Sequence, residues 1–105
     1  MAFSYTVTAT FSDPRVAREW IEWMRTEHLA DVIAASALSG DVIALDDGRV
    51  EARYEFADRA AYERYLADHA PRLRARGLEL FAPERGITYE RRAGLIELRR
   101  TPSNR

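Results

Sequence analysis

The stretch Phe3-Ser-Tyr-Thr-Val-Thr-Ala-Thr-Phe11 decides the fold, because it alternates without a break. Its odd-numbered positions are apolar or aromatic, and its even-numbered positions are Ser or Thr. This period of two predicts a half-buried strand with one face on the core. Ser12, Asp13 and Pro14 follow and predict the start of a helix. Asp13 is suited to cap free backbone amides, and Pro14 is suited to the first helical position.

The next segment predicts an amphipathic helix, because its apolar residues recur at spacings of three and four. We expect this helix to falter near Glu27 and His28 and to resume over 30–36. A continuous helix would bring Glu27 and Asp31 onto the apolar stripe, where unpaired carboxylates are costly. The stripe consists of Val16, Ala17, Trp20, Trp23 and Met24.

A β-hairpin is predicted in the middle of the chain. Asp47-Gly48 is a strong turn signal, and it lies between apolar segments at 42–45 and 50–56. The second segment alternates, so that Tyr54 is expected to face the core.

The second half of the chain predicts two helices and a strand. Asp58 is a suitable N-cap for a helix, and Pro71 breaks or restarts that helix before a further short one. The last strand is expected over 87–98, with a bulge or bend near Gly94. The order strand, helix, strand, strand, helix, strand predicts an α+β, ferredoxin-like βαββαβ fold. It would have a four-stranded antiparallel sheet with helices on one face.

Composition predicts one domain over 1–100 and a flexible C-terminal tail over 101–105. The 105 residues carry a net charge of −1 and contain no cysteine. We therefore expect no disulfide, thiolate metal site or iron–sulfur cluster, and a bacterial cytoplasmic protein is the simplest interpretation. No apolar run is long enough for a membrane span, so no membrane partner is expected. The balanced charge argues against nucleic-acid binding.

A homodimer is expected, because a domain of this size buries a modest core and a partner would help it. The charges are also uneven along the chain. Up to Gly48 acidic residues outnumber arginines eight to three, and after it arginines outnumber acidic residues thirteen to nine. The polar face of the sheet is expected either to be solvated or to pack against a second sheet. That face would carry Thr6, Thr8, Arg53, Glu55, Glu90 and Arg92.

Two blocks of sequence resemble an uncharacterised family of small bacterial proteins, described only as a domain of unknown function. The first is Trp20-x-x-Trp23-Met24-x-x-x-His28-x-x-Asp31-Val32. The second is Tyr62-x-x-Tyr65-x-x-x-His69-Ala70-Pro71-x-Leu73-Arg74-x-x-Gly77-Leu78-x-x-Phe81. The resemblance runs from Tyr5 to about Leu98. The family pattern often has a proline where this chain has Ala30.

The layout is more remotely similar to the dimeric α/β-barrel superfamily. In that superfamily two ferredoxin-like protomers pack sheet against sheet, and each has a pocket between sheet and helices. Its members include cofactor-free antibiotic-biosynthesis monooxygenases, muconolactone isomerase-like proteins and haem-degrading enzymes. This resemblance implies a fold and a dimer, and it says little about chemistry.

His28 and Asp31 are the candidate catalytic residues. Their spacing of three would let the carboxylate orient one imidazole nitrogen and leave the other free as acid or base. The alternative is structural: Asp31 caps the second helical piece and His28 packs at the turn. With His69 they would offer three metal-ligand side chains, but the spacing is not diagnostic, so no metal and no cofactor are expected.

The candidate ligand-binding residues are mostly aromatic. On a helix, Tyr62, Tyr65 and His69 would share one face, and tyrosines on such a stripe most often complete a core. Tyr54 from the sheet and Tyr62 from the helix would hydrogen-bond the ligand, and Arg91 would counter an anion. Trp20, Trp23 and Met24 are more typical of a core than of a cofactor site.

Two functions remain open. One is binding or transformation of a small aromatic or carbonyl-bearing molecule in a pocket between sheet and helices. The other is a non-enzymatic homodimeric module that binds other proteins. A cavity that touches His28 would favour the first, and a filled interior would favour the second. Whether the protein is an enzyme is left open.

Overall fold

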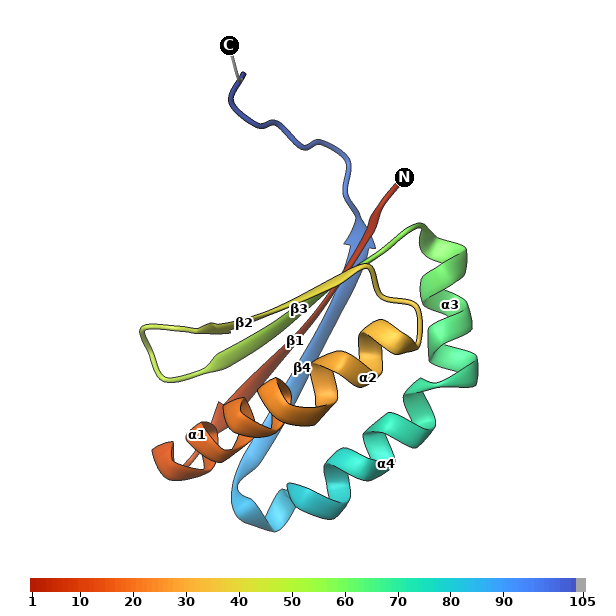
Figure 1. Cartoon of the computed structure of the whole chain (residues 1–105). Helices are drawn as coiled ribbons and strands as arrows, with labels where there is room; N and C mark the ends of the chain where they lie inside the picture. The colour runs from red at the N-terminus through yellow and green to blue at the C-terminus, as the bar shows by residue number, and fades with distance from the viewer. Residues whose placement is uncertain (104–105) are drawn as a thin grey trace.

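The computed structural model describes residues 1–103 and shows an antiparallel sheet with helices on one face (Figure 1). The elements in chain order are β1 (Phe3–Phe11), α1 (Pro14–Trp23), the π-helical turn η1 (Met24–His28), α2 (Leu29–Ala34), β2 (Ser39–Ala44), β3 (Val50–Phe56), α3 (Arg59–Asp68), α4 (Ala70–Leu80), the 3-10 turn η2 (Pro83–Arg85) and β4 (Ile87–Leu95).

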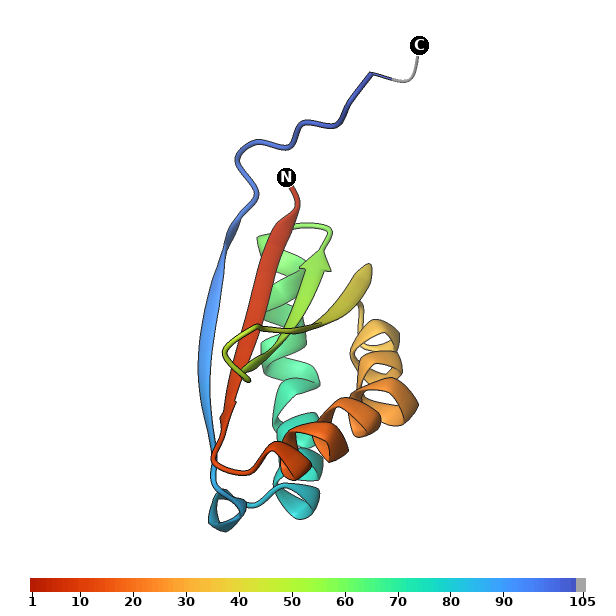
Figure 2. The ribbon, with the colours of Figure 1, turned by 90° about the vertical axis from the view of Figure 1, so that its left-hand side faces the viewer.

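The sheet has the strand order β2-β3-β1-β4, and every neighbouring pair is antiparallel. Figure 2 shows the strands spread beside one another, with α3 and α4 behind them and α1 and α2 to the right, so that the opposite side of the sheet is uncovered. The predicted ferredoxin-like fold is confirmed.

The alternation of β1 sets which residues face the helices. Phe3 and Tyr5 are almost fully buried there, and their partners across the sheet are Phe56 and Tyr54 of β3. These four side chains join Trp20 of α1 in the core, as the sequence predicts.

The uncovered face of the sheet carries the polar side chains. Thr8 and Glu51 lie opposite each other in the β1–β3 register, and the Thr8 hydroxyl donates a 3.2 Å hydrogen bond to the Glu51 carboxylate. Arg53 forms a 2.7 Å ion pair with the same carboxylate, which holds the pKa of Glu51 below its usual value. Glu51 is therefore satisfied although it is only 8% exposed.

The predicted break after α1 is wrong in form, because the helix widens instead of stopping. The backbone stays helical through Met24, His28 and Leu29, and α2 follows η1 directly. With no free helix start at this point, Asp31 has no cap to supply.

The helices of the second half begin and end as their sequence signals predict. The Asp58 carboxylate accepts a 2.8 Å hydrogen bond from the Ala61 amide at the start of α3. His69 leaves helical geometry, with φ −128°, and α4 begins at Ala70 just before Pro71. Pro71 lacks an amide hydrogen and restricts the residue before it, which accounts for the separation of α3 and α4.

Two strand boundaries differ from the prediction. β2 begins at Ser39, before the expected 42–45 segment, and β4 ends at Leu95 without a bulge. Gly94 pairs in regular register with Ser4, so the glycine is accommodated within a straight strand. Of the predicted tail, residues 101–103 are exposed without regular structure, and residues 104–105 lie outside the described residues.

Candidate functional site

A cavity of about 280 Å³ lies between the sheet and the helices. Six of its fourteen lining residues are Tyr or Trp, and the others include one histidine and two arginines. The lining residues are Tyr5, Val7, Trp20, Trp23, Met24, His28, Tyr54, Tyr65, Leu73, Arg74, Gly77, Leu78, Tyr89 and Arg91.

The π turn brings His28 to the cavity. The Leu29 amide donates to the Met24 carbonyl five residues back, which widens the helix here. In an α-helix, residue i+4 lies about 40° further around the helix axis than residue i. The wider turn offsets this drift, so His28 stays on the face that Trp20 and Met24 present to the sheet.

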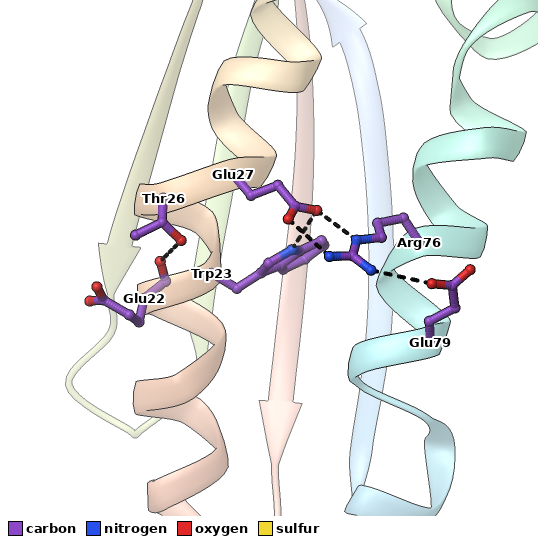
Figure 3. Close-up of polar contacts among 6 residues, drawn as sticks. All are labelled: Glu22, Trp23, Thr26, Glu27, Arg76 and Glu79. Atoms are coloured by element: carbon purple, nitrogen blue, oxygen red, sulfur yellow. Dashed lines mark hydrogen bonds and ion pairs between the residues drawn. The ribbon is translucent and has the colours of Figure 1, made fainter.

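A local contact accounts for the start of the π turn. The Thr26 hydroxyl donates a 2.9 Å hydrogen bond to the carbonyl of Glu22, four residues back (Figure 3). Such side-chain bonds compete with the backbone ladder and bend helices.

His28 is held as a neutral imidazole. It stacks on Trp23 with ring centroids 4.4 Å apart. Burial lowers the pKa of His28 to about 4, although the nearby charges of Asp31 and Glu27 oppose this effect. At neutral pH the ring therefore offers one N–H donor and one nitrogen acceptor.

Trp23 is fixed from behind by a polar network that joins η1 to α4. Its indole N–H donates a 3.2 Å hydrogen bond to Glu27, and Arg76 pairs with Glu27 through contacts of 2.8 and 3.1 Å. Arg76 also reaches Glu79 at 3.3 Å. Figure 3 shows Glu27 between Trp23 and Arg76, with the guanidinium reaching across from α4. The pKa of Glu27 is lowered to about 2, chiefly by its hydrogen bond from Arg76.

The sheet contributes the phenols of Tyr5, Tyr54 and Tyr89 to the cavity wall. The Tyr54 hydroxyl contacts the Met24 sulfur at 3.8 Å, and Tyr89 accepts a 3.2 Å hydrogen bond from the Trp20 indole. Burial raises the pKa of Tyr54 and Tyr89. It also raises the pKa of Tyr65, across the cavity on α3, to about 12. These phenols therefore stay protonated at neutral pH and are hydrogen-bond donors.

Two arginines enter the cavity from different walls. Arg74 of α4 donates a 3.2 Å hydrogen bond to the Tyr5 hydroxyl. Arg91 of β4 lies over the Tyr89 ring, with its guanidinium carbon 5.2 Å from the centroid.

Of the seven predicted site residues, the structure brings four to the cavity: His28, Tyr54, Tyr65 and Arg91. Asp31 lies on α2 outside the lining. Tyr62 stacks on Phe3, with centroids 4.8 Å apart, instead of opening to the cavity. His69 lies at the end of α3, where its Nδ1 is 3.0 Å from Arg72.

The sequence reasoning missed several lining residues. Trp20 and Met24 were assigned to the core, and they are buried there and also line the cavity. The alternation of Arg72, Arg74 and Arg76 in the sequence predicts a solvated outer face of the helix, but Arg74 lines the cavity. The signal for it was present, because Arg74 is three residues before Gly77 and four before Leu78, on one helical face.

Within residues 1–103 no cluster of three or more metal-ligating side chains is present. In the same part of the chain, no helix is long and apolar enough to cross a membrane.

The chain belongs to a family described as a domain of unknown function, DUF4286, whose model matches residues 2–87. The match runs from β1 to the first residue of β4 and includes most of the cavity lining. The chain has no significant match among curated protein sequences.

Solved structures share the fold at low sequence identity. One is a monooxygenase from the gene ActVA-Orf6 of Streptomyces coelicolor in complex with the ligand Nanaomycin D. It has a TM-score of 0.76 and 20% identity, over 97% of this chain and 93% of that chain. A dimeric ferredoxin-like protein from an uncultured marine organism has a TM-score of 0.72 and 11% identity, over 97% and 100%. SnoaB, a cofactor-independent oxygenase from Streptomyces nogalater, has a TM-score of 0.68 and 15% identity, over 93% and 95%.

Proposed function

We propose that this protein binds a small planar molecule that is aromatic and carries a carbonyl group. The observation that carries the proposal is the aromatic cavity that touches His28. Its volume is at the lower end of the range for small-molecule sites. Rings favour such walls because aromatic pairs add stacking energy to apolar burial.

The polar groups in the proposal each have a defined role. Tyr54 and Tyr65 stay protonated and donate hydrogen bonds to the ligand's oxygen. His28, as a neutral imidazole, accepts or donates a proton at the ligand. Asp31 acts on His28 through its charge, and Arg91 counters negative charge on the ligand.

The two remaining candidates have no direct contact with the ligand in this proposal. Tyr62 packs against the Tyr5 ring, with centroids 5.1 Å apart, and so helps to position a lining residue. His69 stabilises the junction between α3 and α4 through Arg72.

The similar solved structures support this proposal through their shared fold and through the kind of protein that two of them are. One of them is a monooxygenase with a bound small molecule, and another is a cofactor-independent oxygenase. The alternative, a non-enzymatic protein-interaction module, is less favoured, because such a module needs no cavity beside His28.

Homodimerisation in the bacterial cytoplasm is part of the proposal. The uncovered face of the sheet would meet its copy, as in a dimeric α/β barrel, and dimeric proteins are among the similar structures. Cell fractionation with an antibody against the chain tests the location.

Isothermal titration with 2-naphthamide, a neutral aromatic carbonyl compound, tests the binding. We expect saturable binding of one molecule per chain. Cyclohexanecarboxamide keeps the amide but has no aromatic ring, and we expect it to bind at least about tenfold more weakly.

A variant that fills the cavity locates the binding site. A Cβ at Gly77 would lie 3.3 Å from the Trp23 ring, so Gly77→Leu places a side chain in the cavity. We expect this variant to lose 2-naphthamide binding and the control Ala75→Leu, on the exposed side of α4, to keep it. Absence of binding to the parent, or equal binding by the two variants, would refute the proposal.

A further inference from the structure

We infer that the ligand of this cavity is an aromatic carboxylate, held by Arg74, Arg91 and the Tyr5 hydroxyl. The inference rests on the proposed function and adds the charge of the ligand and the residues that recognise it. It arises from three donors that line the cavity and that have no anionic partner within residues 1–103.

The two guanidinium groups reach the cavity from different elements, Arg74 from α4 and Arg91 from β4. Arg74 reaches the Tyr5 hydroxyl from α4 at 3.2 Å. Arg91 lies directly across the β1–β4 register from Val7, two residues from Tyr5 and on the same face of the sheet. Both arginines also line the cavity.

A second group supports this placement. Tyr65 lies on α3, and the charges of both Arg74 and Arg91 lower its pKa against the larger opposing effect of burial. Both positive charges therefore act on a residue of the cavity lining.

Neither guanidinium has a carboxylate partner within residues 1–103, whereas neighbouring arginines do. Arg76, two residues after Arg74, pairs with Glu27 and Glu79. Arg92, next to Arg91 but on the other face of the sheet, is 3.9 Å from Glu51. A cavity lined by two positive charges and no carboxylate favours the binding of an anion.

The hydroxyl proton of Tyr5 is free to form a further hydrogen bond within the described part of the chain. Its hydroxyl oxygen accepts the bond from Arg74, and a phenol also carries one donor proton. Within the described residues no acceptor for this proton is recorded. The proton is therefore available to a ligand oxygen beside the two guanidinium groups.

The chemistry of these three donors, Arg74, Arg91 and the Tyr5 hydroxyl, fits a planar carboxylate attached to a ring. Guanidinium groups bind carboxylates through paired N–H donors in one plane. The adjoining walls are aromatic, with Tyr5 stacked near Tyr54 at 5.9 Å between centroids. A ring in the cavity would therefore place its attached carboxylate at the arginines.

The test compares 2-naphthoate with 2-naphthamide, which have the same rings and differ in charge. We expect 2-naphthoate to bind the parent protein at least about tenfold more tightly, since hydrogen bonds to charged groups are stronger than neutral ones. Arg74→Gln and Arg91→Gln should each reduce this preference by about tenfold. The preference is the ratio of the two affinities, so each variant is titrated with both probes.

Arg72→Gln is the matched control. Arg72 lies on α4 as Arg74 does and is exposed, but it contacts His69 and does not line the cavity. It should leave the affinities for both probes unchanged. Melting curves of all variants verify that each is folded, and Tyr5→Phe, which removes only the hydroxyl, should weaken 2-naphthoate alone.

The outcomes separate the two proposals. If both probes bind the parent with equal affinity, or if Arg72→Gln has the same effect as the cavity variants, the inference is overturned and the proposed function stands. If neither probe binds, the proposed function fails and the inference fails with it.

Discussion

His28 is a histidine whose protonation opposes folding. Its imidazole is buried against Trp23, and its pKa in the folded state is lowered to about 4 from 6.5. As the pH falls, the unfolded chain therefore takes up a proton at His28 at a higher pH than the folded chain does. As pH falls from about 6.5 to about 4, stability is lost, and the whole contribution is present only above 6.5.

This sign gives a prediction for His28→Gln, which cannot be protonated. Relative to this variant, the parent should lose up to about 3 kcal/mol of unfolding free energy between pH 7 and pH 4. Urea denaturation at several pH values measures both proteins, and the difference between the two curves removes the titration of the other groups. Parallel curves would show that His28 is not buried as a neutral group.

Trp20 has a different role, because it is core and cavity wall at once. It is 1% exposed, and its indole N–H bonds Tyr89. Trp20→Ala should cost about 3–5 kcal/mol through lost burial and the space left behind. Trp20→Phe keeps most of the burial and should cost less. A melting temperature of the alanine variant within a few degrees of the parent would contradict this assignment.

At the scale of elements, the π turn and α4 are joined by one ion pair. Arg76 and Glu27 connect segments 49 residues apart, and Glu27 also holds the Trp23 indole. The neighbouring pair of Glu22 and Arg25 lies within one helix and is more exposed. Of these two pairs, only Glu27–Arg76 therefore joins segments that are distant in sequence.

A double-mutant cycle tests this coupling. Glu27→Gln and Arg76→Gln should each lower the melting temperature. The double variant should melt no lower than the less stable of the two single variants. Glu22→Gln is the control and should change the melting temperature little, because exposed pairs contribute little. Additive effects of the two substitutions would mean that the pair does not join η1 to α4.

The elements were more predictable from sequence than the site. Strand β1 was predicted with the bounds Phe3–Phe11 because its period of two is unbroken, and the start of α3 followed from Asp58. The π turn was anticipated only as a break. Glu27 on the apolar stripe signalled a problem, but its solution depends on Arg76, which is distant in sequence.

The placement of two groups of side chains differs from the sequence-based expectation, one where a helix ends and one where a charge is expected in solvent. Tyr62, Tyr65 and His69 share a face only if the helix continues, and Pro71 ends it before His69 can join. Arg74 was assigned to solvent because arginines alternate along α4, yet its guanidinium reaches Tyr5. The first difference arises from a local proline, and the second arises from a tertiary contact that local spacing does not encode.

At the scale of the whole molecule, the uncovered face of the sheet is the largest feature without a partner in the described chain. Its centre is built from the even-numbered residues of β1, with Arg53 and Glu90 on either side. Opposite charges on one surface suit a two-fold interface, because each residue then meets a complementary one of the copy.

The last prediction concerns this assembly. We expect a two-fold dimer that buries at least about 1,200 Å² in total, with Thr6, Arg53 and Glu90 in or beside the interface. Thr6→Arg adds a long charged side chain at the centre of the sheet face and should give a particle of 12.0 kDa, the mass of one chain, by light scattering. Ala75→Arg adds the same side chain to the exposed side of α4 and should leave the dimer intact. If the parent scatters as a single chain at tens of micromolar, the dimer is wrong. If the parent is a dimer and Ala75→Arg separates it while Thr6→Arg does not, the chains meet through their helices, and the sheet-to-sheet arrangement is wrong.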